Sequence, residues 1–134
     1  SAKQLSKPCK VKLLGNYIFR QSNPAIVGME VMQGTATTGI QLMKNDGHPI
    51  TTLKEMQDKK ENISEAKKGM QVAGSFDKVT IGRQIHSDDI LYSFITESEF
   101  MTFKEYKKFL EPEEKEIIKE IAEIMRNQNL VWGV

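Results

Sequence analysis

Residues 70–76 read Met-Gln-Val-Ala-Gly-Ser-Phe, and their alternation predicts a β-strand. Successive side chains of a strand point to opposite faces, so Met70, Val72 and Phe76 share one face. Gln71, Ala73 and Ser75 share the other face. We therefore expect the face that carries Phe76 to lie in a hydrophobic core.

Short runs of the same kind flank this segment on both sides. Eight of the nine glycines lie at or before Gly82, and turn residues separate the runs. The expected strands are 11–14, 17–20, 25–32, 39–43, 51–56, 70–76, 80–85 and 90–94, with turns at 22–24, 45–47 and 87–89. Residues 59–68 are expected to form a charged connection with a helical turn. So many short strands favour a mainly β fold, a small closed antiparallel β-barrel.

The pattern changes to a helical period from Thr96 onward. We expect Thr102 and Glu105 to cap a first helix, and Pro112 to open a second. Phe103, Tyr106, Phe109 and Leu110 would line one face of the first helix, and Ile117, Ile118, Ile121, Ala122, Ile124 and Met125 form the stripe of the second. The predicted organisation is a barrel over residues 1–96 and a C-terminal α-helical hairpin over 97–134.

Composition limits the classes of function. The 134 residues are enough for one compact domain, and 19 basic against 18 acidic side chains exclude bulk binding of nucleic acid by charge excess. Residues 1–96 carry 13 basic and 9 acidic side chains, whereas residues 97–134 carry 6 and 9. Any contact with RNA must therefore come from a local patch on the barrel.

The sequence also bears on the cellular setting. The single Cys9 cannot form an internal disulfide, and no apolar run is long enough to span a bilayer. We therefore expect a cytoplasmic, monomeric protein without membrane contact. The first residue is Ser1 rather than Met, which favours a piece of a larger protein.

Catalytic patterns are weak in this sequence. It contains no Gly-x-x-x-x-Gly-Lys-[Ser/Thr] loop, and neither His48 nor His86 has the spacing of a zinc pair or a catalytic triad. Asp88 and Asp89 are adjacent in a turn, so they are better interpreted as turn caps. We expect no enzymatic activity, metal or cofactor in this segment.

Binding is the better-supported hypothesis. The expected basic surface of the barrel consists of Arg20, Lys54, Lys59, Lys60, Lys67, Lys68 and Arg83. A concave cluster of these residues beside Gln57 and Gln71 could hold an RNA backbone, and ordinary solvated charge is the alternative. The helical hairpin has more apolar surface than it can hide by itself. It either docks on the barrel or forms a groove for a partner.

Four segments resemble one known family. Residues 17–28, Tyr-Ile-Phe-Arg-Gln-Ser-Asn-Pro-Ala-Ile-Val-Gly, resemble the opening of the fourth and last domain of translation initiation factor 5B, the relative of bacterial initiation factor two. Residues 65–73, 79–84 and 88–92 resemble later segments of that domain, in the same order and spacing over about residues 10–95. The ending, with Pro112-Glu113-Glu114 and Trp132-Gly133, looks most like archaeal members.

The resemblance implies a barrel like the second domain of elongation factors, attached in a longer parent protein to a GTPase domain that binds GTP and Mg²⁺. In that family the domain holds the methionylated acceptor end of initiator tRNA on the ribosome and promotes subunit joining. The helical extension binds the C-terminal tail of initiation factor 1A. A stand-alone RNA-binding β-barrel without a parent GTPase is the alternative.

The resemblance and the basic residues together give two sets of candidate site residues. The tRNA-binding candidates are Arg20, Met29, Gln57, Gln71, Val72 and Arg83. The bacterial relative has cysteines where this chain has Met29 and Val72. The candidates for binding the partner tail are Phe103, Tyr106, Phe109, Leu110, Ile117, Ile121 and Trp132.

Overall fold

The computed structural model describes residues 7–134, and its first part consists of eight β-strands. The strands are β1 Cys9–Arg20, β2 Ala25–Thr37, β3 Gln41–Met43, β4 Pro49–Asp58, β5 Glu61–Ile63, β6 Glu65–Lys67, β7 Gln71–Phe76 and β8 Ile90–Ser93. The second part consists of the helices α1 Glu97–Glu105 and α2 Pro112–Arg126, joined through a short 3-10 helix, η1 Lys107–Phe109.

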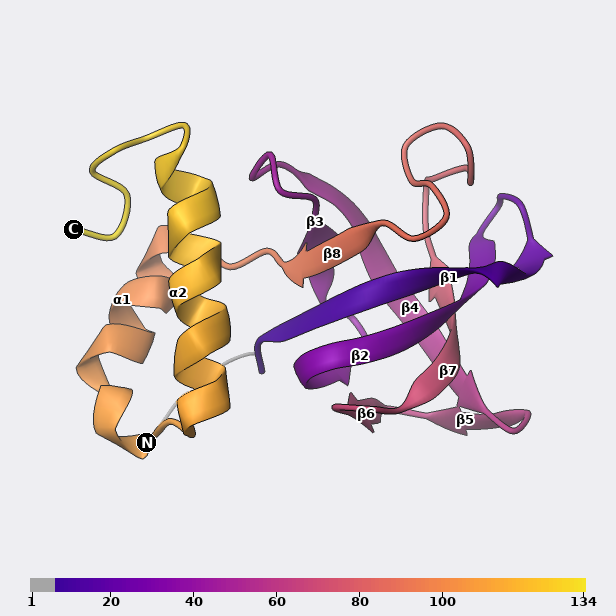
Figure 1. The fold of residues 1–134 in the computed structure, drawn as a ribbon, viewed down its shortest axis with the longest axis horizontal. Coiled ribbons are helices and arrows are strands. Elements are labelled where there is room, and N and C mark those ends of the chain that lie inside the picture. Colours follow the sequence, from indigo (N-terminus) through magenta and orange to yellow (C-terminus); the bar gives the residue numbers. More distant parts are fainter. Residues whose placement is uncertain (1–6) are drawn as a thin grey trace.

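Six of the strands form a closed antiparallel barrel. Their order is β1-β8-β3-β4-β7-β2, and β2 pairs with β1 to close the ring. The short strands β5 and β6 extend β4 and β2 outside the ring. Figure 1 shows the barrel beside the two helices. The predicted fold, a closed antiparallel barrel followed by a helical hairpin, is confirmed.

The barrel core follows the alternation of the strands. Leu13 of β1, Met29 of β2 and Leu53 of β4 point inward and are fully buried. Val72 and Phe76 are buried on one face of β7, as the pattern of residues 70–76 predicts. The same spacing of two residues thus explains the core on each of these strands.

Two predicted segments were wrong. Residues 59–68 contain β5 and β6 instead of a helical turn, because Ile63 pairs with Met56 on β4 and Ala66 pairs with Ala36 on β2. Residues 80–85 form a tight loop instead of a strand: Thr80 makes an isolated bridge to Ser22, and Ile81 makes one to Ile85 within the loop. The pairing of β6 depends on a distant strand, β2, which no local pattern encodes.

The first helix begins earlier than the sequence predicts. Thr96 is its N-cap: the Glu99 N–H donates to Thr96 Oγ1 (3.1 Å) and the Thr96 N–H donates to Glu99 Oε1 (3.0 Å). The predicted cap at Thr102 is wrong, since the Thr102 hydroxyl lies inside the helix and donates to the Ser98 carbonyl. Pro112 does open α2 at its first turn, as predicted.

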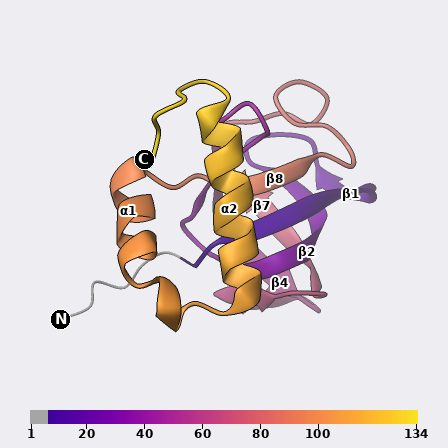
Figure 2. The same cartoon turned by 60° about the vertical axis from the view of Figure 1, so that its left-hand side comes forward.

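The second helix packs against both the barrel and the first helix (Figure 2). Ile117 is fully buried and lies over Gly34 of β2, where an added Cβ would meet Ile117 Cδ1 at 2.7 Å. Two polar contacts support this packing: the Gly34 N–H donates to Glu113 Oε1 (2.6 Å), and Lys10 Nζ lies 3.3 Å from Glu120 Oε1. The hairpin is therefore fixed to the barrel at β1 and β2.

Candidate binding cavity and hairpin surface

A bulge in β1 places the side chains of Tyr17 and Phe19 on the surface of the barrel. Leu14 pairs with Gly28, but the next paired residue of β1 is Ile18, which faces Val27. Three residues of β1 are therefore unmatched on β2, and such a bulge redirects the side chains around it. The predicted strands 11–14 and 17–20 are thus one bent strand. Tyr17 lies over Gly28, where an added Cβ would meet Tyr17 Cβ at 2.9 Å.

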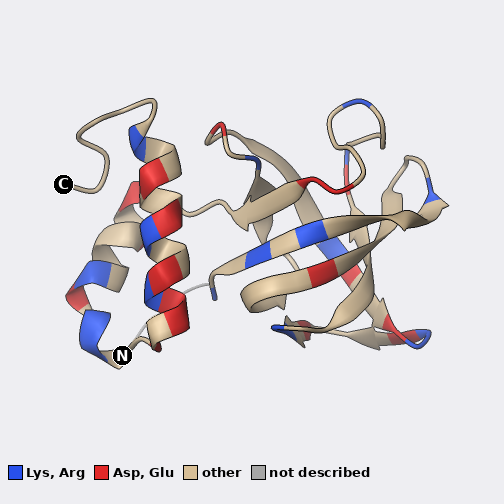
Figure 3. Ribbon diagram, in the orientation of Figure 1, with Lys and Arg blue, Asp and Glu red and all other residues tan. Residues whose placement is uncertain are grey.

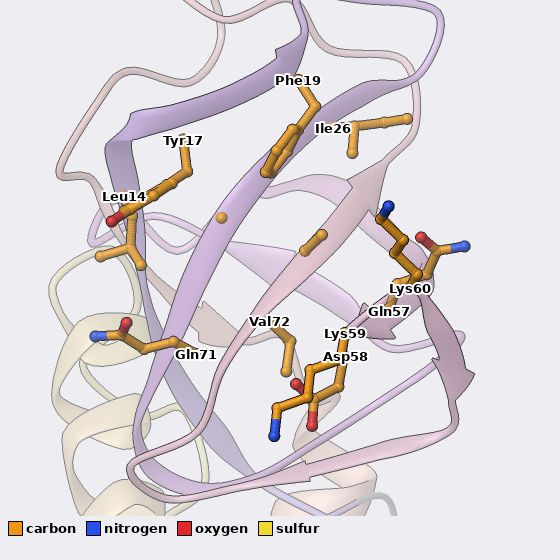
Figure 4. Close-up of a pocket in the computed structure, with 12 residues that line it drawn as sticks. Leu14, Tyr17, Phe19, Ile26, Gln57, Asp58, Lys59, Lys60, Gln71 and Val72 are labelled. Carbon is orange, nitrogen blue, oxygen red and sulfur yellow. The ribbon is translucent and has the colours of Figure 1, made fainter.

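The bent end of β1 forms one wall of a cavity of about 630 Å³ (Figure 4). Residues of β2, the end of β4, the turn between β4 and β5 and the first residues of β7 form the rest. Its lining residues are Leu14, Tyr17, Phe19, Ile26, Gly28, Gln57, Asp58, Lys59, Lys60, Gln71, Val72 and Ala73. The wall is mainly apolar, and a few polar groups lie at its edge. This is the composition typical of a site for a small ligand group.

The two glutamines at the cavity are each held by one neighbour. Gln71 Nε2 donates to Glu30 Oε1 (3.0 Å), and Gln57 Nε2 donates to Asn62 Oδ1 (3.1 Å). These bonds orient the two amides and leave their Oε1 atoms without a donor from residues 7–134. Both glutamines can therefore accept a hydrogen bond from a ligand.

The structure brings together half of the candidate tRNA-binding residues. Gln57, Gln71 and Val72 line the cavity. Met29 is fully buried in the barrel core and does not line it. Arg20 and Arg83 are also absent from the lining; Arg20 is exposed at the end of β1, and its Nε donates to the Ser22 carbonyl.

Sequence reasoning missed the aromatic wall of the cavity. Tyr17 is 56% exposed and Phe19 is 65% exposed, although large apolar side chains on a strand usually face the core. The two aromatic residues share one face of a predicted strand, which is a usable signal. The bulge that turns them towards Val72 and Gln71 depends on pairing with β2, so the cavity itself was not predictable.

The hairpin candidates fall into two groups. Phe103, Ile117, Ile121 and Trp132 are buried in the core between the helices and the barrel, together with Met43 and Ile95. Tyr106 and Phe109 are 43% and 72% exposed, and Leu110 is half-buried. The single predicted face does not form, because α1 ends at Glu105 and the 3-10 helix η1 turns the next residues outward.

The residues that follow α2 fold back and pack against α1. The Trp132 ring packs 4.8 Å from the ring of Phe100. Arg126 Nε donates to the Trp132 carbonyl (2.7 Å), and Lys104 Nζ donates to the Gly133 carbonyl (2.9 Å). Trp132 is therefore part of the hairpin core.

The distribution of charge differs between α2 and η1 of the hairpin. In Figure 3 acidic and basic residues alternate along the ribbon of α2, whereas η1 is basic. Lys107 and Lys108 lie in η1, and Lys108 Nζ is 5.4 Å from the centre of the Phe109 ring. The most exposed aromatic residue of the hairpin thus lies in its basic segment.

Within residues 7–134, no group of three or more His, Cys, Asp or Glu side chains is placed to hold a metal ion. None of the helices formed by these residues is long and apolar enough to cross a membrane. The closed six-stranded antiparallel barrel with its two C-terminal helices defines a β-barrel domain with a helical extension. Residues 7–92 match the family model described as elongation factor Tu domain 4, and the chain belongs to this family.

Three archaeal proteins are similar to this chain over nearly its whole length. The probable translation initiation factor IF-2 of Methanopyrus kandleri is 42% identical over 98% of this chain, and that of Hyperthermus butylicus is also 42% identical over 98%. The crystal structure of GDP-bound aIF5B from Aeropyrum pernix superimposes with a TM-score of 0.86, at 34% identity over 92% of this chain. The chain spans 22% of the length of either IF-2 relative and 21% of the aIF5B chain. The resemblance to archaeal members of the initiation factor 5B family is confirmed.

Proposed function

We propose that this domain acts in translation initiation by holding the methionylated acceptor end of initiator tRNA in the cavity beside β1. The observation that supports this function is the cavity itself. It joins an apolar wall of Tyr17, Phe19 and Val72 to the amides of Gln57 and Gln71. The relatives named as translation initiation factors support the biological setting.

The chemistry of the cavity suits an aminoacyl group esterified to RNA. A methionine side chain is flexible and apolar, so it gains from burial against aromatic and aliphatic surface. The amides of Gln57 and Gln71 can accept a hydrogen bond from the amino group of the methionine. The lysines at the edge match the phosphates of the RNA, which supply sequence-independent affinity.

The longer protein is proposed to be a GTPase that acts on the ribosome and promotes joining of the subunits. Support comes from the aIF5B relative, which was crystallised with GDP, and from the length of the relatives. In this arrangement the nucleotide and Mg²⁺ belong to the parent's GTPase domain, and the present domain supplies binding energy for positioning.

The helical hairpin is proposed to bind the C-terminal tail of initiation factor 1A. Only the outward part of the candidate set is accessible: Tyr106 and Phe109, whose ring centres lie 6.4 Å apart. Lys107 and Lys108 lie between these two residues in the sequence and would attract an acidic tail, although the extension as a whole has more acidic than basic groups. A few aromatic anchors commonly carry most of the energy at such interfaces.

A pair of exposed phenylalanines tests both binding functions. Phe19→Ala should weaken binding of a methionylated RNA at least tenfold and leave binding of the 1A tail peptide unchanged. Phe109→Ala should do the reverse, because the two residues lie in different parts of the molecule. Both side chains are largely exposed, so neither variant should unfold the domain. Calorimetric titration of each variant with each ligand measures the four affinities.

The same titrations address the alternative function. A stand-alone RNA-binding barrel would bind methionylated and unmethionylated RNA equally well. Equal affinities for these two ligands, or a Phe19→Ala variant with wild-type affinity, would contradict the proposed function. An unchanged affinity of Phe109→Ala for the tail would remove the hairpin surface alone.

A further inference from the structure

The turn between β4 and β5 has an unusual sequence for its shape. Asp58 pairs with Glu61, so only Lys59 and Lys60 connect the two strands. Both have positive backbone φ angles, 52° for Lys59 and 70° for Lys60. Positive φ at both central residues identifies a type I′ turn, the usual connection for a tight hairpin.

Lysine is a poor choice for these positions on structural grounds alone. A type I′ turn strongly prefers Asn-Gly, because the Cβ of other residues crowds the backbone in the left-handed conformation. Strained backbone of this kind is concentrated at functional sites, where another requirement selects the side chain. The fold by itself does not account for two consecutive lysines here.

The location of the turn suggests what that requirement is. Lys59 and Lys60 both line the cavity. The ion pairs within residues 7–134 are Lys7–Glu65, Lys10–Glu120 and Lys44–Asp89, so neither turn lysine takes part in one. In Figure 4 the two side chains leave the turn in different directions, Lys60 beside Gln57 and Lys59 beside Asp58. Their ammonium groups can therefore reach separate points on an extended ligand.

We propose that Lys59 and Lys60 bind successive backbone phosphates of a single-stranded RNA 3′ end whose terminal aminoacyl group occupies the cavity. This inference rests on the proposed function and names the phosphate contacts of that site. The left-handed turn carries the two ammonium groups to the rim of the cavity. The strand must then run across the β4–β5 turn before its last nucleotide enters between Tyr17 and Val72.

The test replaces the lysines with the residues that the turn itself prefers. K59N/K60G removes both charges and relieves the backbone, so its melting temperature should rise by about 2–8 °C. Its affinity for RNA should fall, and the slope of log affinity against log salt should flatten by about 0.7 for each lost contact with a single strand. A gain in stability with a loss of binding is the signature of residues kept for a ligand.

A second variant and a control separate charge from backbone. K59Q/K60Q keeps similar side chains in the same turn, so it should show the flatter salt slope without the rise in melting temperature. K115A/K119A removes two exposed lysines from α2, outside the cavity, and should keep the wild-type slope. The probe is an RNA stem-loop with a single-stranded 3′ tail that carries methionine in a stable amide linkage. Fluorescence anisotropy at several salt concentrations gives the slopes.

The outcomes distinguish this inference from the proposed function. Wild-type slopes in both turn variants would overturn the lysine contacts while leaving methionine recognition intact. Equal binding of methionylated and unmethionylated tails would overturn the proposed function, and the slopes would still decide the role of the lysines. Failure of the wild-type protein to bind either tail would overturn both.

Discussion

At the residue scale, the environment of Cys9 controls the chemistry of the single thiol. Cys9 is fully buried in β1, and the Ser93 hydroxyl lies 3.3 Å from its Sγ atom. Burial raises the pKa of Cys9 from 9.0 to about 11, and the hydrogen bond from Ser93 opposes this with a smaller lowering effect. The folded protein therefore keeps the thiol proton at pH values where the unfolded chain releases it.

This pKa predicts a loss of stability at alkaline pH. The contribution of Cys9 is fully present below pH 9 and is lost as the pH rises towards 11, because proton release favours the unfolded chain in that window. Between pH 8 and pH 11 the wild-type protein should lose on the order of 2 kcal/mol more of its unfolding free energy than Cys9→Ala. Urea denaturation of both proteins across this range measures the difference, and parallel pH profiles would contradict the prediction.

At the element scale, the stability of α1 depends on the hydrogen bonds at its N-terminus and on packing against neighbouring residues. It has only nine residues, and isolated helices of that length are marginal in water. The reciprocal hydrogen bonds between Thr96 and Glu99 satisfy backbone groups that the helix leaves free. Packing of Phe100 and Phe103 supplies the remaining stability.

Two threonines test which residue caps this helix. Thr96→Ala should lower the unfolding free energy by about 1 kcal/mol, the usual contribution of a threonine N-cap. Thr102→Ala should change it by less than about 0.5 kcal/mol, because Thr102 lies inside the helix. Thermal denaturation of the two variants gives the comparison. Equal effects would mean that the Thr96 side chain does not cap α1.

The individual helices and strands also show how much of the fold can be predicted from the sequence. Alternation located the core residues Val72 and Phe76, and Pro112 marked the start of α2. The Thr96–Glu99 pair matches the capping pattern as well as Thr102–Glu105 does, so the beginning of α1 was predictable. Strand β6 and the β1 bulge were not, because each depends on pairing with β2. The cavity wall at Tyr17 depends on that bulge.

At the scale of the whole molecule, barrel and hairpin share one hydrophobic contact region. Met43 of β3 and Ile95 after β8 are buried with Ile117 and Ile121 of α2. The contacts of Gly34 and Lys10 with α2 add polar links between the two parts. Neither part can open without exposing apolar surface of the other.

This shared packing predicts a single unfolding transition. Trp132 is the only tryptophan and lies in the hairpin core, so its fluorescence reports on the helices. Far-UV circular dichroism reports on the strands and helices together, and the two denaturation curves should coincide. Ile117→Ala should shift both curves together, with a loss of about 2–5 kcal/mol. Earlier loss of the Trp132 signal would show that the hairpin unfolds independently.

The fixed position of α2 has a mechanical consequence. The cavity is lined by the end of β1 and by the β4–β5 turn, which lie on the side of the barrel away from the helices (Figure 1), whereas Tyr106 and Phe109 belong to the hairpin. No flexible linker separates these ends within residues 9–126, since α2 is packed onto β1 and β2. The barrel and the hairpin therefore form one packed unit, with the cavity at one end and the Tyr106–Phe109 surface at the other. Two ligands bound at its ends would be held at a constant separation. When both ligands belong to one larger assembly, capture of the first would therefore raise the effective concentration of the second at its own site.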